Sequence, residues 1–144
     1  MNAAFFLTPK QEVASLFDNH TVRQGLEKMR HHGYSALPVT TKENKYIGII
    51  SEGDFLWYLL DADGGNLDPE KRKKIEKTRI RDIMSQEQLP PVKITVSMEE
   101  LLERVLNQNF VPVVDDTNSF IGIVTRKGVI RYFSKNQQHQ MRIG

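Results

Sequence analysis

The chain contains the same pattern twice, and this internal repeat limits the folds that it can adopt more than any other feature. The pattern is a Pro-Val segment, a gap of six residues, and an apolar segment that contains Gly and ends in Ser or Thr. It spans residues 38–51 and recurs at 112–125, an offset of 74 residues. Because such self-similarity marks one supersecondary unit present in several copies, we expect two similar halves.

A helix is predicted before each copy of the pattern. Thr21 is followed three residues later by Gln24, and Ser97 by Glu100, which is the spacing of a capping box. Apolar residues at helical spacing follow both starts. The two helices are offset by 76 residues, so the second copy is two residues shorter between its helix and its Pro-Val segment.

Further strands and helices complete each unit. Short strands are expected at Val13–Leu16 and Val92–Val96, and second helices at Phe55–Leu60 and Val129–Phe133. The order of elements in each unit is then β-α-β-β-α. The predicted fold class is α+β.

The segment between the two units is predicted to hold a loop and a short polar helix. Asp61–Asn66 has the composition of a loop, and Asp68 before Pro69 is typical of an N-cap followed by Pro in the first helical turn. The expected division is a first repeat at 1–62, a linker with this helix at 63–79, a second repeat at 80–136 and a basic C-terminal tail at 137–144.

The composition argues against several classes of protein. The 144 residues include no Cys, which excludes disulfides and thiol chemistry and fits a reducing compartment. No apolar run approaches the roughly 20 residues of a membrane helix, and the start lacks a signal-peptide pattern, so we expect a cytoplasmic protein. No P-loop or Gly-x-Ser-x-Gly motif is present, so no enzymatic activity and no required cofactor are expected. The histidines form no metal-ligand pattern, and no metal site is predicted; they are His20, His31, His32 and His139.

Positive charge gathers in two places although the net charge is only +2. Lys71–Lys74 is one, and the segment after Arg126 is the other. These residues form either a solvated helix face and a soluble tail or a surface for an anionic partner such as nucleic acid. The aromatic side chains that would alternate with the cations in a nucleic-acid site are missing.

Together the repeated motifs resemble a tandem of CBS domains, the cystathionine-beta-synthase-type regulatory module. The resemblance rests on Ala36–Val39 with Gly48–Asp54, and on Val111–Val113 with Gly122–Gly128. It implies two βαββα units packed about a pseudo-two-fold axis, a Bateman module, with clefts that bind nucleotides. The function that it implies is non-catalytic regulation through conformational or oligomeric change.

A narrower resemblance is to small free-standing CBS proteins of Gram-positive bacteria, several of which bind cyclic di-AMP. It rests on Glu12–Ala14, Gly33–Ala36, Asn109–Val111 and Thr125–Lys127. The ligand that the resemblance implies is an adenine nucleotide. The choice among AMP, ADP, ATP, S-adenosylmethionine and cyclic di-AMP stays open.

A nucleotide site needs groups for the ribose, the base and the phosphate. Ser51 and Asp54, three residues apart at a strand-to-helix turn, suit a ribose, although helix capping explains the same pair. Tyr34 offers a stacking face, although a single aromatic is more often part of a core. The residues expected to bind nucleotide are Val13, Ala14, Tyr34, Ser35, Ala36, Pro38, Ser51, Asp54, Phe110, Val111, Thr125, Arg126 and Lys127.

The second repeat departs from the first at the position that matches Asp54, where it has Gly128. Glycine offers no group to a ribose hydroxyl, so one cleft is expected to be weaker. Arg126 and Lys127 at the helix start can hold a phosphate instead, or can be solvated cations. The asymmetry predicts one nucleotide-type site per chain.

The helix at 55–60 is apolar on every side, which predicts a partner surface. CBS tandems dimerise through such helices, so the expected homodimer interface is Phe55, Trp57, Tyr58 and Leu60, with extra core as the alternative. The downstream protein partner is unknown from the sequence. A ligand-free dimeric scaffold and a weak nucleic-acid-binding protein remain the other functional hypotheses.

Overall fold

The computed structural model describes residues 2–61, 68–85 and 89–143, and they form an α+β protein with two compact units. One unit contains residues 14–90, and the other contains residues 1–13 together with 91–144. Each unit has its own sheet and its own apolar core. The expected loop at Asp61–Asn66 falls almost entirely outside the described residues.

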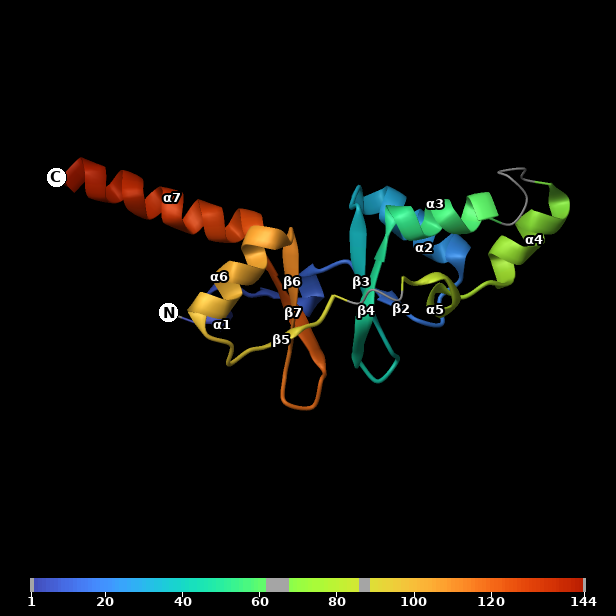
Figure 1. Cartoon of the computed structure of the whole chain (residues 1–144), viewed down its shortest axis with the longest axis horizontal. Helices are drawn as coiled ribbons and strands as arrows, with labels where there is room; N and C mark the ends of the chain where they lie inside the picture. Colours follow the sequence, from blue (N-terminus) through green and yellow to red (C-terminus); the bar gives the residue numbers. More distant parts are fainter. Residues whose placement is uncertain (1, 62–67, 86–88, 144) are drawn as a thin grey trace. The chain divides into compact units, whose positions relative to one another are not determined.

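The unit of residues 14–90 is built on a three-stranded sheet in the order β2-β3-β4. The strands are β2 (Leu16–Phe17), β3 (Ala36–Thr40) and β4 (Tyr46–Ser51), with β2 parallel and β4 antiparallel to β3. Helices α2 (Val22–His32) and α3 (Glu52–Asp61) lie together on one side of the β3–β4 hairpin (Figure 1). Helices α4 (Pro69–Lys77) and α5 (Ile80–Ile83) follow. The buried core residues are Leu16, Val22, Met29, Leu37, Val39, Ile50, Phe55 and Ile80.

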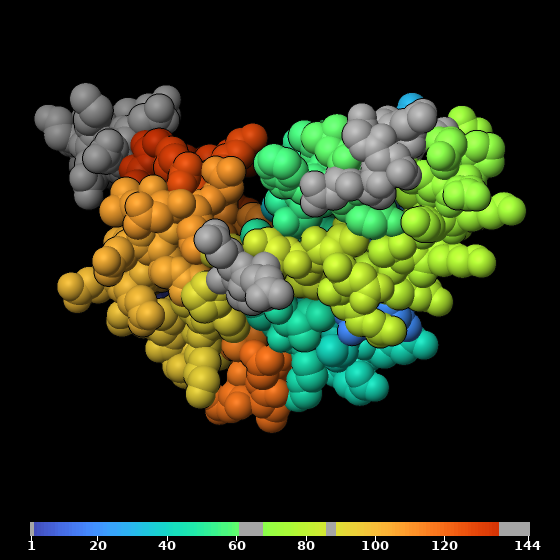
Figure 2. All heavy atoms as spheres, turned by 45° about the vertical axis from the view of Figure 1, so that its right-hand side comes forward, coloured from blue at the N-terminus to red at the C-terminus, as the bar shows by residue number. Residues whose placement is uncertain are grey.

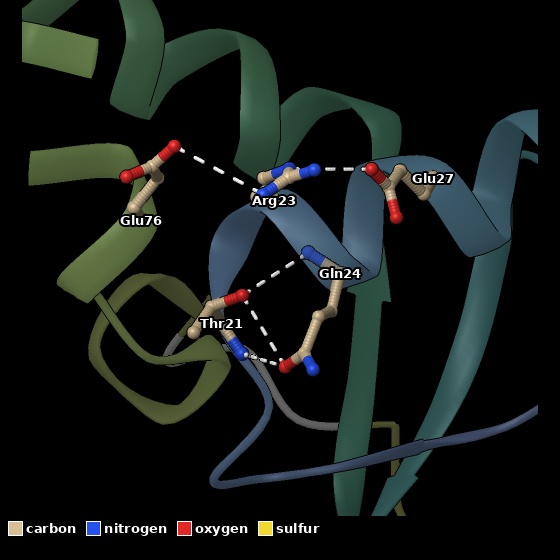
Figure 3. A network of polar contacts seen from close by, with 5 residues as sticks. All are labelled: Thr21, Arg23, Gln24, Glu27 and Glu76. Carbon is tan, nitrogen blue, oxygen red and sulfur yellow. Dashed lines mark hydrogen bonds and ion pairs between the residues drawn. The ribbon is translucent and has the colours of Figure 1, made fainter. Parts of the chain in front are cut away.

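Both ends of α2 are fixed by local chemistry, as the sequence predicts for its start. The Gln24 N–H donates to Thr21 Oγ1 at 3.1 Å, and the Thr21 N–H donates to Gln24 Oε1 at 2.8 Å, which is a complete capping box (Figure 3). At the other end Gly33 adopts φ +69° and its N–H donates to Met29 O at 2.9 Å. This left-handed conformation suits glycine because it has no Cβ.

The other unit is built on a four-stranded sheet in the order β1-β7-β6-β5. Its strands are β1 (Thr8–Pro9), β5 (Val92–Lys93), β6 (Phe110–Val114) and β7 (Phe120–Thr125). Its helices are α1 (Ala3–Phe6), the 3-10 helix η1 (Lys10–Glu12), α6 (Met98–Asn107) and α7 (Arg126–Ile143), which starts where β7 ends (Figure 1). The buried core residues are Ala3, Val92, Leu101, Val105, Val111, Val113, Val124 and Val129.

The two hairpins have the same register, which confirms the predicted repeat. Ala36 pairs with Ser51, and Phe110 pairs with Thr125. Both hairpins carry an irregularity at the same place, after Val39 in one and after Val113 in the other. The sequence repeat is therefore a structural repeat.

Each compact unit contains the first segment of the other sequence repeat: residues 1–13 belong to the unit of 91–144, and residues 80–90 belong to the unit of 14–90. Strand β1, from the first repeat, pairs with β7 of the second, and Ile80, from the second repeat, is fully buried in the core of residues 14–90. Gly122 permits this pairing, because a Cβ built on it at φ +155° would lie 2.2 Å from Thr8 O. The helix at 69–77, N-capped by Asp68 as predicted, belongs to the same unit as α2 and α3.

Several predicted elements differ in extent from those observed. The expected strand at 13–16 is reduced to β2 at Leu16–Phe17, and the strand at 92–96 ends at Lys93. Ser97 caps α6 by accepting from the Glu100 N–H at 3.1 Å, but among the described residues no bond returns from the Glu100 side chain. Helix α7 runs from Arg126 to Ile143, so the segment expected as a tail is helical to residue 143. Short patterns fix the type of an element better than its ends.

Candidate functional site

In the unit of residues 14–90, the residues expected to bind nucleotide gather at one end of the β3–β4 hairpin. Ala36 is opposite Ser51 in the sheet, and the Glu52 N–H donates to Ser35 O at 2.9 Å. Tyr34 precedes this pair of strands, and Asp54 lies in the first turn of α3. These contacts bring Tyr34–Ala36 next to Ser51–Asp54, and we refer to them as the first half-site.

Ser51 and Asp54 bond to each other in both directions. The Ser51 N–H donates to Asp54 Oδ2 at 2.9 Å, and the Asp54 N–H donates to Ser51 Oγ at 3.2 Å. The pair therefore caps α3, which is the other role that the sequence predicted for these two residues. It also presents a hydroxyl and a carboxylate together at a helix N-terminus, with both side chains partly exposed.

Tyr34 is 49% exposed and is not part of the core. Its ring lies parallel to that of His32, with centroids 5.7 Å apart and an interplanar angle of 6°. The ring also borders an open, largely apolar groove of about 370 Å³ between α2 and α3. The groove is lined by Leu26, Met29, Arg30, Gly33, Tyr34, Glu52, Phe55, Leu56 and Leu59.

Pro38 is buried in the central strand of its sheet and not on an edge strand. Strand β2 pairs with β3 only at Val39 and Thr40, so at Pro38 the ladder on that side has ended. A residue without an N–H is tolerated there because no neighbouring strand needs it. Pro112 has the same position relative to β5, which pairs at Val113 and Val114.

In the other unit an equivalent half-site forms at the end of the β6–β7 hairpin. Phe110 is opposite Thr125, and the Gly128 N–H donates to Thr125 Oγ1 at 3.0 Å, as the Asp54 N–H does to Ser51. Val111 is fully buried in the core of this unit and offers no surface to a ligand. Lys127 is exposed. We refer to Asn109–Val111 with Thr125–Gly128 as the second half-site.

Arg126 is half-buried, and its guanidinium bonds to protein acceptors instead of standing free for a phosphate. Its Nε donates to Val105 O at 2.7 Å, and its two terminal nitrogens donate to Leu106 O at 3.3 Å and to Asn109 Oδ1 at 3.2 Å. All three guanidinium nitrogens therefore bond to the end of α6 and the segment after it. No local pattern could have shown this, because 17 to 21 residues separate the partners in sequence.

Val13 and Ala14 lie where the chain passes from one compact unit to the other. The Val13 N–H donates to Lys10 O at 3.1 Å and ends η1, while Ala14 packs against the core of residues 14–90. Both are half-buried. Neither residue has a described contact to Tyr34–Ala36 with Ser51–Asp54 or to Asn109–Val111 with Thr125–Gly128.

Helix α3 carries an exposed apolar face that only partly matches the expected interface. Phe55 is 2% exposed and packs in the core of residues 14–90, so its assignment to the dimer interface is corrected. Tyr58 packs against that core, and its hydroxyl is 2.8 Å from Thr78 Oγ1. Trp57 is 66% exposed and Leu60 is 42% exposed. Leu56, which was not predicted from the sequence, is 55% exposed; helical spacing places it beside Leu60 and could have identified it.

The run Lys71–Lys74 is mostly a solvated helix face. The side chains of α4 project from the surface (light green in Figure 2), and Arg72, Lys73 and Lys74 are exposed. Lys71 is the exception, because it is buried and its ammonium group donates to Leu59 O near the end of α3. A cation is favourable at a helix C-terminus. Arg23 also joins α2 to α4, with Glu76 at 3.9 Å (Figure 3).

His20 has a lowered pKa, and its ring takes part in a hydrogen bond within the fold. Burial, and to a lesser extent the charge of Lys28, lowers the pKa of His20 below its usual value of 6.5. Its Nδ1 accepts a hydrogen bond from the Phe17 N–H at 3.1 Å, which requires that nitrogen to be unprotonated. Within the described ranges no group of three or more His, Asp or Glu side chains can hold a metal ion. None of the described helices combines the length and apolar character needed to cross a membrane.

The comparisons with known proteins agree with this repeated architecture. A family model for the CBS domain matches residues 7–61 and 80–135. An uncharacterised protein of Methanocaldococcus jannaschii is 27% identical over 132 residues, covering 87% of this chain and 47% of the relative. Two further curated relatives are covered over 22% and 49% of their lengths, so the chain spans about half or less of these three proteins.

Solved structures resemble the chain over nearly all of its length. Listeria monocytogenes CbpB in complex with c-di-AMP is 25% identical with a TM-score of 0.80, covering 94% of this chain and 97% of that chain. CBSX2 in complex with AMP, a chloroplastic protein of Arabidopsis thaliana, is 26% identical with a TM-score of 0.72, covering 94% and 98%.

Proposed function

The chain belongs to the CBS domain family, and on that premise we propose that it is a non-catalytic regulatory module that binds an adenine nucleotide. The observation that carries the proposal is the first half-site. A hydroxyl and a carboxylate stand at the start of α3, next to an exposed aromatic ring and a strand end. Similar proteins have been crystallised with AMP and with c-di-AMP, which supports this ligand class.

Each group of the first half-site suits one part of a nucleotide. Ser51 Oγ and the Asp54 carboxylate can bond the hydroxyls of a ribose, because the pair stays partly exposed while it caps α3. Tyr34 can stack on a base with one face, since its other face is backed by the parallel ring of His32. The small side chains of Ser35 and Ala36 allow a base close to the backbone.

The second half-site carries an exposed cation in place of a carboxylate. Within its own unit Lys127 is the cation that can bind a phosphate, because it is exposed at the start of α7 whereas Arg126 bonds to α6. The absence of a carboxylate at Gly128 leaves this half-site without a ribose group. One nucleotide-type site per chain follows from this asymmetry.

Signalling follows from differential affinity. A nucleotide that binds one arrangement of the units or chains more tightly than another shifts the population toward it, and a protein partner reads the difference. We propose a cytoplasmic homodimer whose interface is the exposed α3 face of Leu56, Trp57 and Leu60 with the groove beside it. The same face favours the second candidate function, a dimeric scaffold that binds no nucleotide.

The experiment that tests the proposal is calorimetric titration of the protein with AMP, ATP and c-di-AMP. Asp54→Ala is compared with Glu43→Ala, which removes a carboxylate from an exposed turn of the same unit. We expect at least one nucleotide to bind the Glu43→Ala variant as it binds the unaltered protein, and Asp54→Ala to weaken that binding about 10-fold or more. Equal affinities in both variants would remove Asp54 from the site. If no nucleotide binds, the dimeric scaffold is the function that remains.

A further inference from the structure

The two repeats end their first helices by different means. In the first repeat α2 ends at His32, and Gly33 turns the chain in the left-handed conformation. The Gly33 N–H donates to Met29 O at 2.9 Å and so satisfies a carbonyl of the last turn.

The second repeat lacks the residues that make this cap. The helix offset of 76 aligns Met29 with Val105, and the hairpin offset of 74 aligns Ser35 with Asn109. The two residues missing from the second repeat therefore lie within His32–Tyr34, and Gly33 is one of them because Gln108 directly follows the last helical residue in an extended conformation. Helix α6 ends at Asn107, and Gln108 is already extended, with φ −138° and ψ 142°.

The guanidinium of Arg126 occupies the place of the missing cap. Its Nε donates at 2.7 Å to Val105 O, the carbonyl equivalent to Met29 O. A terminal nitrogen donates to Leu106 O at 3.3 Å, and the other donates to Asn109 Oδ1 at 3.2 Å. A planar fork of donors on one side chain is suited to several acceptors at once.

The backbone hydrogen bond that joins the start of the second helix to the segment before the hairpin is the same in both repeats. The two repeats therefore differ here in the side chain. The Arg126 N–H donates to Asn109 O at 2.9 Å, just as the Glu52 N–H donates to Ser35 O at 2.9 Å. The first repeat has a glutamate at this position, and its helix is already capped by Gly33. The donor side chain is present in the repeat that has lost its glycine.

We infer that Arg126 is a positioning residue that replaces the absent glycine cap, ends α6 and thereby holds Asn109–Val111 in the second half-site. The role of Arg126 in nucleotide binding rests on the proposed function. Its role in ending α6 does not. Arg126 keeps its contacts to α6 when the site is occupied, and Lys127 alone meets the phosphate.

The test compares Arg126→Met with Lys127→Met by amide hydrogen exchange. Both variants lose one positive charge from the first turn of α7. We expect the amides at the end of α6 and in 109–111 to exchange about 10-fold faster in Arg126→Met and at the unaltered rate in Lys127→Met. Arg126→Lys is a milder second variant and should give an intermediate rate, because one ammonium group cannot reach three acceptors.

A compensating insertion makes the test specific to the cap. Gly-Tyr inserted between Gln108 and Asn109 restores the length of the first repeat. The insertion should return exchange in Arg126→Met to within about twofold of the same insertion in the unaltered protein. Unchanged exchange in both Arg126→Met and Arg126→Lys, or equal acceleration by Arg126→Met with and without the insertion, overturns the inference.

Titration with AMP and c-di-AMP separates this inference from the proposed function. If a nucleotide binds, its addition should leave or increase the protection at the end of α6, and loss of protection there would show that Arg126 moves to the ligand and contradict the inference. If neither nucleotide binds, the proposed function fails, and the exchange data without ligand still decide whether Arg126 caps α6.

Discussion

At the scale of single residues, Asp54 has two roles, because the carboxylate proposed to bind ribose already accepts from the Ser51 N–H. Asp54→Ala should lower the free energy of unfolding by about 1 kcal/mol, the usual cost of a lost cap. Asp54→Asn keeps an oxygen for the Ser51 N–H and should cost less. Urea denaturation of the three proteins measures the difference, and equal stability of all three would show that the capping bonds contribute nothing.

His20 should make stability depend on pH. Its pKa is lowered in the folded state, so between that value and 6.5 the unfolded chain binds more protons, and the free energy of unfolding falls as pH falls. The contribution is complete above pH 6.5 and is lost as pH drops through the lowered pKa. The physical event is protonation of Nδ1, which removes the acceptor of the Phe17 N–H.

Urea denaturation at pH 7.5, 6.5 and 5.5 tests this, with His20→Asn as the comparison because its side chain does not titrate and keeps an oxygen acceptor. The unaltered protein should lose more stability than the variant over this range. His31→Asn, on an exposed position of α2, is the control and should follow the unaltered protein. Parallel curves for the unaltered protein and His20→Asn would contradict the account.

At the scale of elements, β1 depends on one glycine of β7. A Cβ at Gly122 would lie 2.2 Å from Thr8 O and 2.9 Å from Leu7 Cδ1, so Gly122→Ala must displace β1. We expect a loss of about 2–3 kcal/mol. Gly33→Ala is the control, because a Cβ there meets open space and strains only the backbone at φ +69°, for about 1 kcal/mol.

Chemical denaturation of the two glycine variants gives the ranking directly. A smaller loss for Gly122→Ala than for Gly33→Ala would mean that β1 contributes little to the unit of residues 1–13 and 91–144. Native-state hydrogen exchange at Thr8 and in β7 shows whether the loss is local to β1.

The elements differ in how far the sequence could predict them. Helix α2 was predictable at its start because Thr21 and Gln24 are local signals, and the hairpins were predictable because the repeat shows the same alternation twice. The pairing of β1 with β7 was not, since a two-residue strand has no periodicity and its partner lies more than 100 residues away.

The candidate site shows the same division between local and distant contacts. Ser51 with Asp54 was predictable because three residues separate them, and both of their bonds form. Arg126 was expected on a phosphate because its neighbours in sequence favour an anion. Its bonds to Val105 and Leu106 depend on where α6 ends in space.

At the scale of the whole molecule, the exposed face of α3 predicts the oligomeric state. Leu56→Glu combined with Trp57→Glu places two charges on side chains that are 55% and 66% exposed, so folding of the single chain should be little affected. Light scattering after gel filtration should show a dimer for the unaltered protein and a monomer for the double variant. Lys73→Glu, on the exposed face of α4, should remain dimeric. A monomeric unaltered protein, or a dimeric double variant, would contradict the proposed interface.

Thermal unfolding of the purified protein with and without AMP, ATP and c-di-AMP shows whether the folded chain binds an adenine nucleotide. A ligand at about 100 times its dissociation constant adds roughly 2.7 kcal/mol to the native state, which raises the midpoint of a chain this size by several degrees. We expect such a rise with at least one of the three nucleotides. An unchanged midpoint with all three at millimolar concentration would contradict it.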